Sequence, residues 1–387
     1  MNPFVSAVEA PPIAEAWSWV QGRAFPADKP LIDLCQAVPG YAPAEELRAH
    51  LAREVDAYDT ARYTGIAGIP PLLSALAGRM TDLYGGPVKP EEVMITAGCN
   101  QAFVVAVMTL AKPGDNVILP APWYFNHKMT LDMLGIEVRP LPCRPENGLV
   151  PDPADAERLI DARTKAVVLI TPNNPTGAIA PPPTIAAFHD LCAAWGMHLL
   201  LDETYRDFPI SEDAPHGLFR RPDWGKTLVH LYSFSKVYSL AGYRVGAIVA
   251  APELLEQAMK VLDCLAICAP HIGQKAALYG LEHLDGWVAG RRADIAARVA
   301  AFQDAMGDGR TGYGIASIGA YFAFVRHPFP GRPATEVARE LADRHNILCL
   351  PGPMFGPGQE DYLRFAFANV DAATMPEIAR RLAQGRG

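Results

Sequence analysis

The segment LYSFSKVYSLAGYRVG, residues 231–246, contains a single lysine, Lys236, with Ser233 and Ser235 close before it. It follows an apolar run that predicts a buried strand, and a lysine there costs desolvation free energy unless its amine is used. In a water-poor pocket the pKa of a lysine falls, and its neutral amine can form a Schiff base with a carbonyl compound. Lys236 is therefore a candidate nucleophile, and its carbonyl partner needs further groups to hold it.

Two polar turns that follow predicted strands offer such groups. In LLLDETY, Asp202 ends a buried apolar run and Tyr205 follows it closely. An ionised aspartate in that position needs a cationic partner, such as the protonated nitrogen of a pyridine ring. In TPNNPTG, Asn174 lies in a rigid turn and carries an amide donor. Ligands of open α/β sheets bind at the carboxyl ends of the strands, so we expect these side chains to lie close together.

A third junction suits a phosphate group. TAGCNQA places Gly98, Cys99 and Asn100 between a predicted strand and a helix start, where free N–H groups and the helix dipole favour an anion. Ser233 and Arg244 can complete this cup with hydroxyl and guanidinium donors. A reactive lysine, an acid, an amide donor and a phosphate cup are together what pyridoxal phosphate (PLP) requires.

Two further motifs supply an aromatic surface and a buried cation. APWYFNH offers Trp123 and Tyr124 for stacking on a ring. YLRFAFA puts Arg364 within an apolar strand, where a guanidinium group needs a carboxylate. Arg364 therefore predicts a binding site for a carboxylate group.

These motifs are carried by alternating strands and helices. Predicted strands, several of them continuous apolar runs, occupy residues 91–98, 116–124, 136–142, 165–172, 198–205, 227–235 and 245–251. Predicted helices occupy residues 70–86, 100–114, 184–196 and 251–270. The alternation predicts an α/β fold with a mostly parallel central sheet and helices on both faces.

The pattern changes toward the carboxyl terminus. Helices are predicted at residues 291–306, 334–346 and 373–384, and strands at 320–328, 347–352 and 362–369. We therefore expect three regions along the chain. They are an extended, proline-rich N-terminal arm with part of a small domain (1–45), a large PLP-binding α/β domain (46–274) and a smaller α+β domain (275–387).

The chain resembles the fold type I PLP-dependent aminotransferases of class I/II, which include aspartate and aromatic aminotransferases. The likeness covers almost the whole chain and keeps the family's order of motifs. These are YTGIAGIPPL, TAGCNQA, APWYF, TPNNPTG, LDETY, SFSKVYSLAGYRVG and YLRFAFA. Any one of them is weak evidence, but seven in order are specific.

The resemblance implies a role for each motif residue. Lys236 would be the Schiff-base lysine and the acid–base catalyst of a 1,3-proton shift. Asp202 would pair with the pyridinium nitrogen, and Tyr205 would bond the ring oxygen. Asn174 would bond the same oxygen and contact the substrate, whose α-carboxylate Arg364 would bind in a bidentate pair. The remaining cofactor-binding residues would be Gly98, Cys99, Asn100, Tyr124, Ser233, Ser235 and Arg244.

A homodimer with shared active sites is also implied by the resemblance. Tyr63 matches a tyrosine that reaches the phosphate bound by the partner subunit. The Asn174–Pro175 peptide bond is expected to be cis, as it often is in the family.

Two departures from the family pattern bear on the substrate. The stretch LCQAVPGY carries Cys35 and Ala37 where the family usually has glycines, and Ala37 would narrow the carboxylate pocket or shift the arm. His127 stands where a tyrosine is common. The arm also contains Trp17 and Trp19, and arms of this family often close over the substrate, which would favour an apolar or aromatic amino donor.

Composition excludes several classes of function. The 387 residues carry a net charge of -8, which disfavours nucleic acid and anionic membranes as partners. No apolar run is long enough to span a membrane, and the first residues do not form a secretory signal, so a cytoplasmic location is expected. The seven cysteines are scattered, no metal-ligand motif occurs, and Cys264 and Cys268 are expected to form a buried pair on one helix face.

Three functions are compatible with these motifs. The first is an aminotransferase that moves an amino group from an α-amino acid to a 2-oxo acid by a ping-pong mechanism. The second is a PLP-dependent lyase, such as a carbon–sulfur β-lyase, or an oxidase on the same fold. The third is a ligand sensor, which the intact Lys236, Asp202 and Arg364 and the lack of a basic N-terminal domain disfavour.

Overall fold

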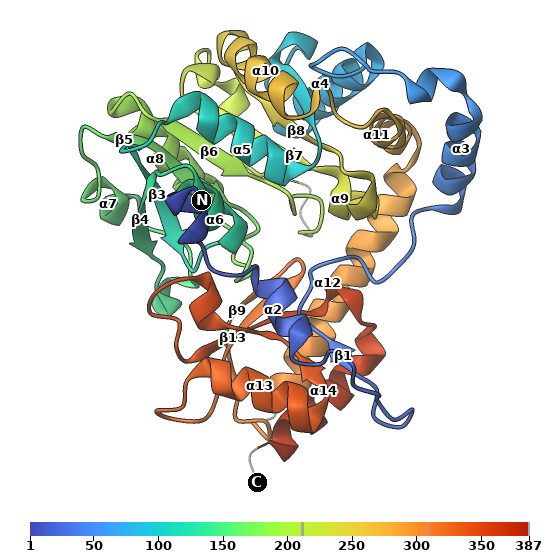
Figure 1. Ribbon diagram of the computed structural model, residues 1–387, viewed down its shortest axis with the longest axis vertical. Helices are drawn as coiled ribbons and strands as arrows, with labels where there is room; N and C mark the ends of the chain where they lie inside the picture. Colours follow the sequence, from blue (N-terminus) through green and yellow to red (C-terminus); the bar gives the residue numbers. More distant parts are fainter. Residues whose placement is uncertain (210–212, 308, 386–387) are drawn as a thin grey trace.

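A sheet of seven strands forms the centre of the larger part of the molecule in this computed structural model, which describes residues 1–209, 213–307 and 309–385 (Figure 1). The strand order is β2-β8-β7-β6-β5-β3-β4, and only β8 runs antiparallel to its neighbours. The strands are β2 (Val93–Thr96), β3 (Asn116–Ala121), β4 (Glu137–Pro142), β5 (Thr164–Ile170), β6 (His198–Asp202), β7 (Leu228–Ser233) and β8 (Gly246–Val249). The predicted mostly parallel sheet is confirmed.

Helices cover both faces of this sheet, as the apolar strands predict. Successive residues of β6 face opposite cores, since Leu199 and Leu201 belong to one apolar cluster and Leu200 to the other. The first cluster is covered by α4 (Pro70–Tyr84), α8 (Pro182–Ala194) and α11 (His271–His283). The second is covered by α5 (Cys99–Leu110), α6 (Phe125–Met133) and α10 (Pro252–Ala266).

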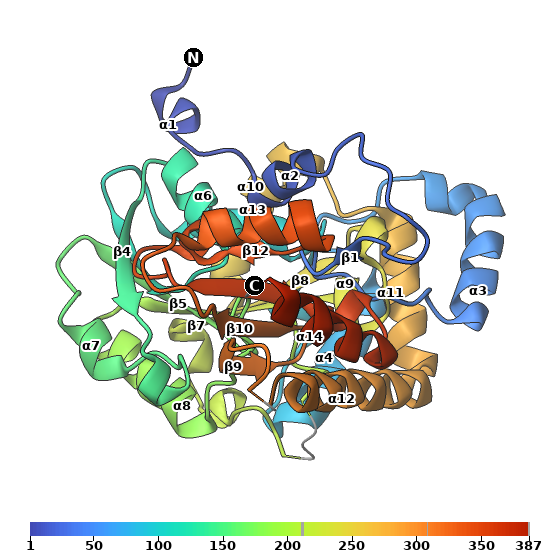
Figure 2. The same cartoon turned by 90° about the horizontal axis from the view of Figure 1, so that it is seen from below.

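A smaller sheet of four antiparallel strands lies below the first in Figure 1, in the order β12-β13-β10-β9. Its strands are β9 (Gly314–Gly319), β10 (Phe322–Arg326), β12 (Leu350–Pro351) and β13 (Tyr362–Ala366). It packs with α12 (Asp285–Gly307), α13 (Ala334–His345) and α14 (Met375–Gln384), as Figure 2 shows from below. The expected strand at 347–352 is in fact two, because β11 (Ile347–Leu348) pairs instead with β1 (Ile32–Asp33) of the arm.

The N-terminal arm is not extended throughout, which corrects the expectation for residues 1–45. It contains α1 (Pro3–Ser6) and α2 (Pro12–Ser18). Each helix has proline in its first turn, where the missing N–H costs nothing, and the Asn2 side chain caps α1. Helix α1 packs on α6 and projects from the body in Figure 2, while Ala16 of α2 and Val20, which follows α2, are buried.

Five further helices were not predicted from the sequence, namely α3 (Glu45–Asp56), α6, α7 (Pro153–Glu157), α9 (Phe234–Val237) and α11. The expected domain boundary at 274/275 falls within α11, and the division into domains stays a prediction. The expectation of a buried cysteine pair is wrong. Helix α10 ends at Ala266, Ile267 has a φ of 62°, and this leaves Cys264 exposed and Cys268 partly exposed.

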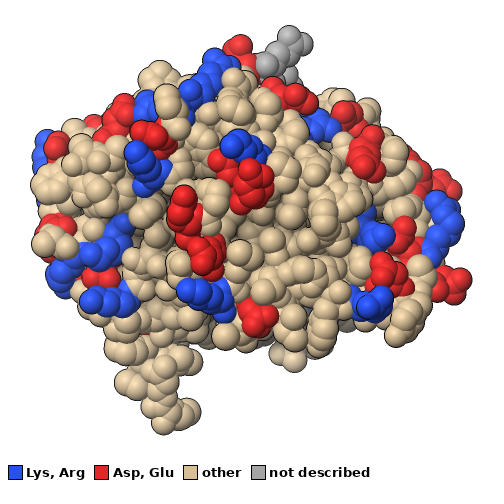
Figure 3. Space-filling model, turned by 90° about the horizontal axis from the view of Figure 1, so that it is seen from above, with Lys and Arg blue, Asp and Glu red and all other residues tan. Residues whose placement is uncertain are grey.

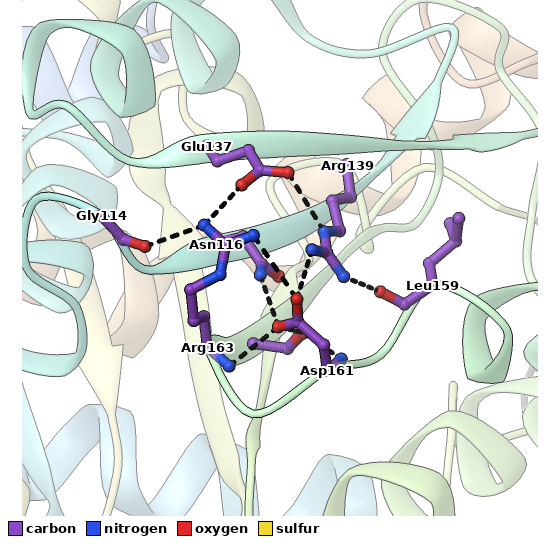
Figure 4. A network of polar contacts seen from close by, with 8 residues as sticks. Gly114, Asn116, Glu137, Arg139, Leu159, Asp161 and Arg163 are labelled. Atoms are coloured by element: carbon purple, nitrogen blue, oxygen red, sulfur yellow. Dashed lines mark hydrogen bonds and ion pairs between the residues drawn. The ribbon is translucent and has the colours of Figure 1, made fainter.

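A polar network ties β3, β4 and the residues before β5 together at their amino ends (Figure 4). Asp161 accepts from the Asn116 amide at 2.9 Å and lies 2.5 Å from the Arg139 guanidinium, and Arg163 lies 2.9 Å from Glu137. The Arg163 backbone N–H, the Asn116 amide and Arg139 hold the pKa of Asp161 below its usual range. The network stabilises the edge of the sheet that lies opposite the carboxyl ends of the strands.

Charged side chains are interspersed on the surface. Figure 3 shows acidic and basic groups mixed across one face of the molecule, with no continuous stripe of either sign. This face therefore offers no basic track of the kind that binds a nucleic-acid backbone. Among the described helices, none combines the length and the apolar character needed to cross a bilayer.

Candidate active site

A cavity of about 410 Å³ lies at the carboxyl ends of the central strands and contains most of the predicted site residues. Asp202 ends β6, Ser233 ends β7, and Tyr124 and Asn174 follow β3 and β5. Parallel strands deliver these side chains to one edge of the sheet. The predicted residues that line the cavity are Ala37, Cys99, Asn100, Tyr124, Asn174, Asp202, Tyr205, Ser233, Ser235, Lys236, Arg244 and Arg364.

Lys236 lies on α9, the short helix that begins directly after β7. Its Nζ donates a hydrogen bond of 2.6 Å to the Ala37 carbonyl, and no described carboxylate pairs with it. Burial, and then the positive charges of Arg244 and Arg364, lower the pKa of its amine to about 8. A substantial fraction of the amine is therefore neutral, and nucleophilic, close to physiological pH.

Asp202 is a buried carboxylate without a cationic side chain beside it. It accepts a hydrogen bond of 2.9 Å from the Thr204 backbone N–H, and burial raises its pKa. The imidazole of His127 faces this carboxylate, with its Nε2 3.5 Å away. Burial lowers the pKa of His127 to about 3, so this imidazole is neutral and brings no positive charge. Asp202 thus suits the cationic nitrogen of a pyridinium ring.

The position of His127 bears on one interpretation of the sequence. Its departure from the family pattern was expected to bear on the substrate and not on the cofactor. The imidazole instead stacks on Phe103, with 3.8 Å between ring centroids, and faces Asp202. His127 therefore lies beside Asp202, the carboxylate that is expected to pair with the ring nitrogen of the cofactor.

The start of α5 forms an anion cup. Gly98 precedes the helix with a φ of 82°, and a β-carbon there would lie 2.4 Å from a guanidinium nitrogen of Arg244. Only glycine permits this close approach. The Arg244 guanidinium donates to the carbonyls of Ala241 and Ala97 and pairs with no described carboxylate, while the first N–H groups of α5 belong to Cys99 and Asn100. Gly98 shapes the cup without lining the cavity, and the cup suits a phosphate group.

Tyr124 and Tyr205 supply aromatic surface and hydroxyl groups. The Tyr124 hydroxyl donates to Asn100 at 3.3 Å, and its ring lines the cavity. Trp123 was the alternative for stacking, but its ring packs under Gly356 and Lys128. Tyr205 is buried against Phe322, and burial raises its pKa. Of Trp123 and Tyr124, Tyr124 is thus better placed to stack on a bound ring.

Arg364 on β13 is a fully buried guanidinium that meets only neutral acceptors. It donates to Asn174 Oδ1 at 3.2 Å and to the Cys35 carbonyl, while its Nε has no partner among the described residues. Phe322 and Phe355 flank it at 5.4 and 5.2 Å. A buried cation in this setting lacks its counterion, so the site fits a carboxylate ligand. The Asn174–Pro175 bond that shapes this wall is cis, as expected.

Several predicted residues do not reach the cavity. The Tyr63 side chain is 75% exposed on the single chain. Trp17 is exposed, and Arg339 lies over the Trp19 ring at 4.9 Å, so both aromatic residues point away from the site. The arm contributes Pro11 and Ile13 to the cavity instead, and no sequence pattern singles these two out.

A buried polar cluster that sequence reasoning missed anchors the turn after β6. The Glu203 carboxylate lies 2.8 Å from His230 Nε2 and accepts from the Tyr84 hydroxyl, which in turn accepts from Arg206 at 3.1 Å. Burial alone would raise the pKa of Glu203, but His216 and His230 hold it below its usual range. Through Tyr84 the cluster connects the turn that follows Asp202 to the end of α4.

Comparisons with known proteins agree with this geometry. The family model described as aminotransferase class I and II matches residues 29–382. An aromatic aminotransferase of Arabidopsis thaliana is 30% identical over 82% of this chain and 80% of its own length. An arginine–pyruvate transaminase of Pseudomonas aeruginosa is 29% identical over 83% of this chain and 81% of its own length. An aspartate aminotransferase of Thermus thermophilus solved with maleate has the same fold, with a TM-score of 0.90 and 23% identity over 100% of this chain and 99% of that one.

Proposed function

The chain belongs to the family of class I and II aminotransferases, whose members depend on PLP, and we propose that it transfers an amino group from an α-amino acid to a 2-oxo acid with PLP linked to Lys236. The proposed mechanism is ping-pong. The amino donor gives up its amino group and leaves as a 2-oxo acid before the acceptor binds.

The observation that carries this proposal is the set of unpaired charges in one cavity. Lys236, Arg244 and Arg364 make no ion pair with a described carboxylate, and Asp202 has no cationic side chain beside it. The buried charges among them, on Asp202 and Arg364, are costly unless a ligand completes them. A cofactor with a phosphate, a carbonyl group and a cationic ring nitrogen would satisfy Arg244, Lys236 and Asp202. The α-carboxylate of a substrate would satisfy Arg364.

PLP, when bound, supplies an electron sink that makes the α-proton of the amino acid acidic. The residues of the chain bind and orient the reactants. Arg364 would hold the α-carboxylate in a bidentate pair and thereby fix the α-carbon next to Lys236. The neutral Nζ of Lys236 would take the α-proton and return it during the 1,3-shift. Asp202 would keep a proton on the ring nitrogen.

The other cavity residues would hold the cofactor in place. Arg244, Ser233 and Ser235 and the first N–H groups of α5 would bind the phosphate. Asn174 and Tyr205 would donate to the ring oxygen, and Tyr124 would stack on the ring face. Ala37 would lie beside the substrate, because its carbonyl already accepts from Lys236.

A homodimer with shared sites is part of the proposal. Tyr63 is a large aromatic side chain that is exposed on one chain and would find its partner only across a subunit interface. Its hydroxyl would reach the phosphate bound by the partner subunit and complete a cup that Arg244 leaves open at the surface.

The reaction without an acceptor tests the proposed function. The PLP-loaded protein is mixed with excess amino donor and no 2-oxo acid, and products are counted. We expect one 2-oxo acid per active site, no free ammonia, and a second turnover only after an acceptor is added. Continued release of ammonia and pyruvate without an acceptor would indicate a lyase and would contradict the aminotransferase.

A further inference from the structure

One wall of the cavity lies outside the groups assigned to the cofactor and the α-carboxylate. We call it the substrate wall, and it consists of Pro11, Ile13, Gln36, Val38, Phe125 and Asn126. These residues come from the arm around the start of α2, from the loop after β1 and from the start of α6. The side chain of an amino acid whose carboxylate lies on Arg364 would have to contact this wall.

The substrate wall has no charged side chain. Of the described residues around the cavity, only Lys236, Arg244, Arg364 and Asp202 are charged. Under the proposed function each of them already binds a group of the cofactor or of the substrate. In the same order, these groups are the carbonyl carbon, the phosphate, the α-carboxylate and the ring nitrogen. Among the described residues of the same subunit, no lining charge therefore remains for the side chain of the substrate.

Charged residues near the wall are held elsewhere. On the arm, Arg23 lies 3.2 Å from Asp343, and Glu15 lies 3.8 Å from Arg339, so both turn toward α13. On α6, Lys128 pairs with Asp132 and lies over the Trp123 ring. Moving one of these groups into the cavity would break an existing contact.

The wall is also backed by apolar packing. Phe125 is buried in a cluster with Phe355 and Leu350, and Ile13 packs against the same cluster. A second carboxylate or ammonium group placed here would lose water and gain no counterion. The amides of Gln36 and Asn126 are neutral and can bond a single polar atom.

From this arrangement we propose that the amino donor is an α-amino acid with an uncharged, mainly apolar side chain. Acidic and basic amino acids are disfavoured. The inference rests on the proposed function, because it takes the positions of the cofactor and of the α-carboxylate from it.

Binding of unreactive analogues tests the substrate class apart from turnover. α-Methyl amino acids lack the α-proton, so they bind without being transaminated. We expect calorimetry on the PLP-loaded, full-length protein to give Kd values for α-methylleucine at least about tenfold lower than for α-methylaspartate or α-methylornithine. Equal or tighter binding of either charged analogue would overturn the inference and leave the proposed function intact.

A matched pair of variants places the selectivity at the wall. Ile13→Lys adds a cation, and we expect it to improve the affinity for α-methylaspartate relative to α-methylleucine by about tenfold or more. Ile13→Gln changes polarity and shape without charge and should not produce this shift. An identical shift in both variants, or none in Ile13→Lys, would contradict the assignment of the wall. Failure of all three analogues to bind the PLP-loaded wild-type protein would contradict the proposed function itself.

Discussion

Lys236 is reactive because of where its amine lies. Burial and the charges of Arg244 and Arg364 lower its pKa to about 8, whereas an ordinary lysine titrates at 10.5. Only the neutral amine is a nucleophile, so its reactivity should rise with pH up to about 8 and then level off. Competitive acetylation of the cofactor-free protein, followed by mass spectrometry of the peptide, measures this midpoint. The unfolded chain is the control, and an equal midpoint in both states would contradict the account.

Arg364 should govern affinity for the amino acid and not for the cofactor. Arg364→Lys keeps the charge but loses the planar bidentate pair, and we expect the affinity for α-methylleucine to fall about 10- to 100-fold. Calorimetry on the PLP-loaded variant measures this, with Arg339→Lys on the exposed face of α13 as the matched control. Unchanged amino acid affinity in Arg364→Lys would show that the α-carboxylate binds elsewhere.

Residues in strand-end motifs could be predicted from the sequence, and residues brought in by packing could not. Asp202, Asn174 and Lys236 follow apolar strands, and a parallel sheet necessarily places them at one edge. His127 reaches Asp202 through the packing of α6, and Ile13 reaches the cavity through the packing of the arm. Nothing in their local sequence indicates which way these side chains turn.

At the scale of elements, the turn after β6 depends on the cluster around Glu203. Glu203→Ala would leave His230 and Tyr84 without their buried acceptor. We expect the free energy of unfolding to fall by about 3–5 kcal/mol, measured by urea denaturation.

The matched control for this prediction is Glu137→Ala in the network of Figure 4. Glu137 is half-exposed and pairs with arginines at the surface, so its loss should cost about 1 kcal/mol or less. Equal losses of stability in the two variants would mean that the Glu203 cluster does not anchor β6.

Element types could be predicted best where the pattern was long. Helix α4 begins at a proline pair and ends before Gly85, and β6 is a continuous apolar run, so both were identified. The arm was mistaken for extended chain because its helices are short and their apolar faces pair only with distant residues, such as Leu348 and Leu350. For the same reason one predicted strand proved to be β11 and β12 in different sheets.

At the scale of the whole molecule, the proposed dimer makes Tyr63 part of the neighbouring site. Tyr63→Ala and Lys236→Ala homodimers should each lose most activity. Mixed dimers of the two should recover part of it, because one of their two sites combines an intact Lys236 with an intact Tyr63. Activity measured after unfolding and refolding the two variants together tests this. Recovery no greater than the sum of the separate variants would contradict shared sites.

The overall architecture could be predicted because strands and helices alternate along the chain, which leaves few ways to build a sheet covered on both faces. The separate pairing of β1 with β11 could not be predicted, since these two strands are far apart in sequence. The net charge of -8 and the mixed surface in Figure 3 carry no information about the substrate, which is read from the cavity.

The most direct test of the central claim locates the cofactor before and after the first half-reaction. The PLP-loaded protein is treated with borohydride, digested, and searched by mass spectrometry for the cofactor adduct. We predict the adduct on the Lys236 peptide, its loss when an amino donor is added first, and its return when a 2-oxo acid follows. An adduct on another lysine, or one on Lys236 that no amino donor removes, would contradict the account.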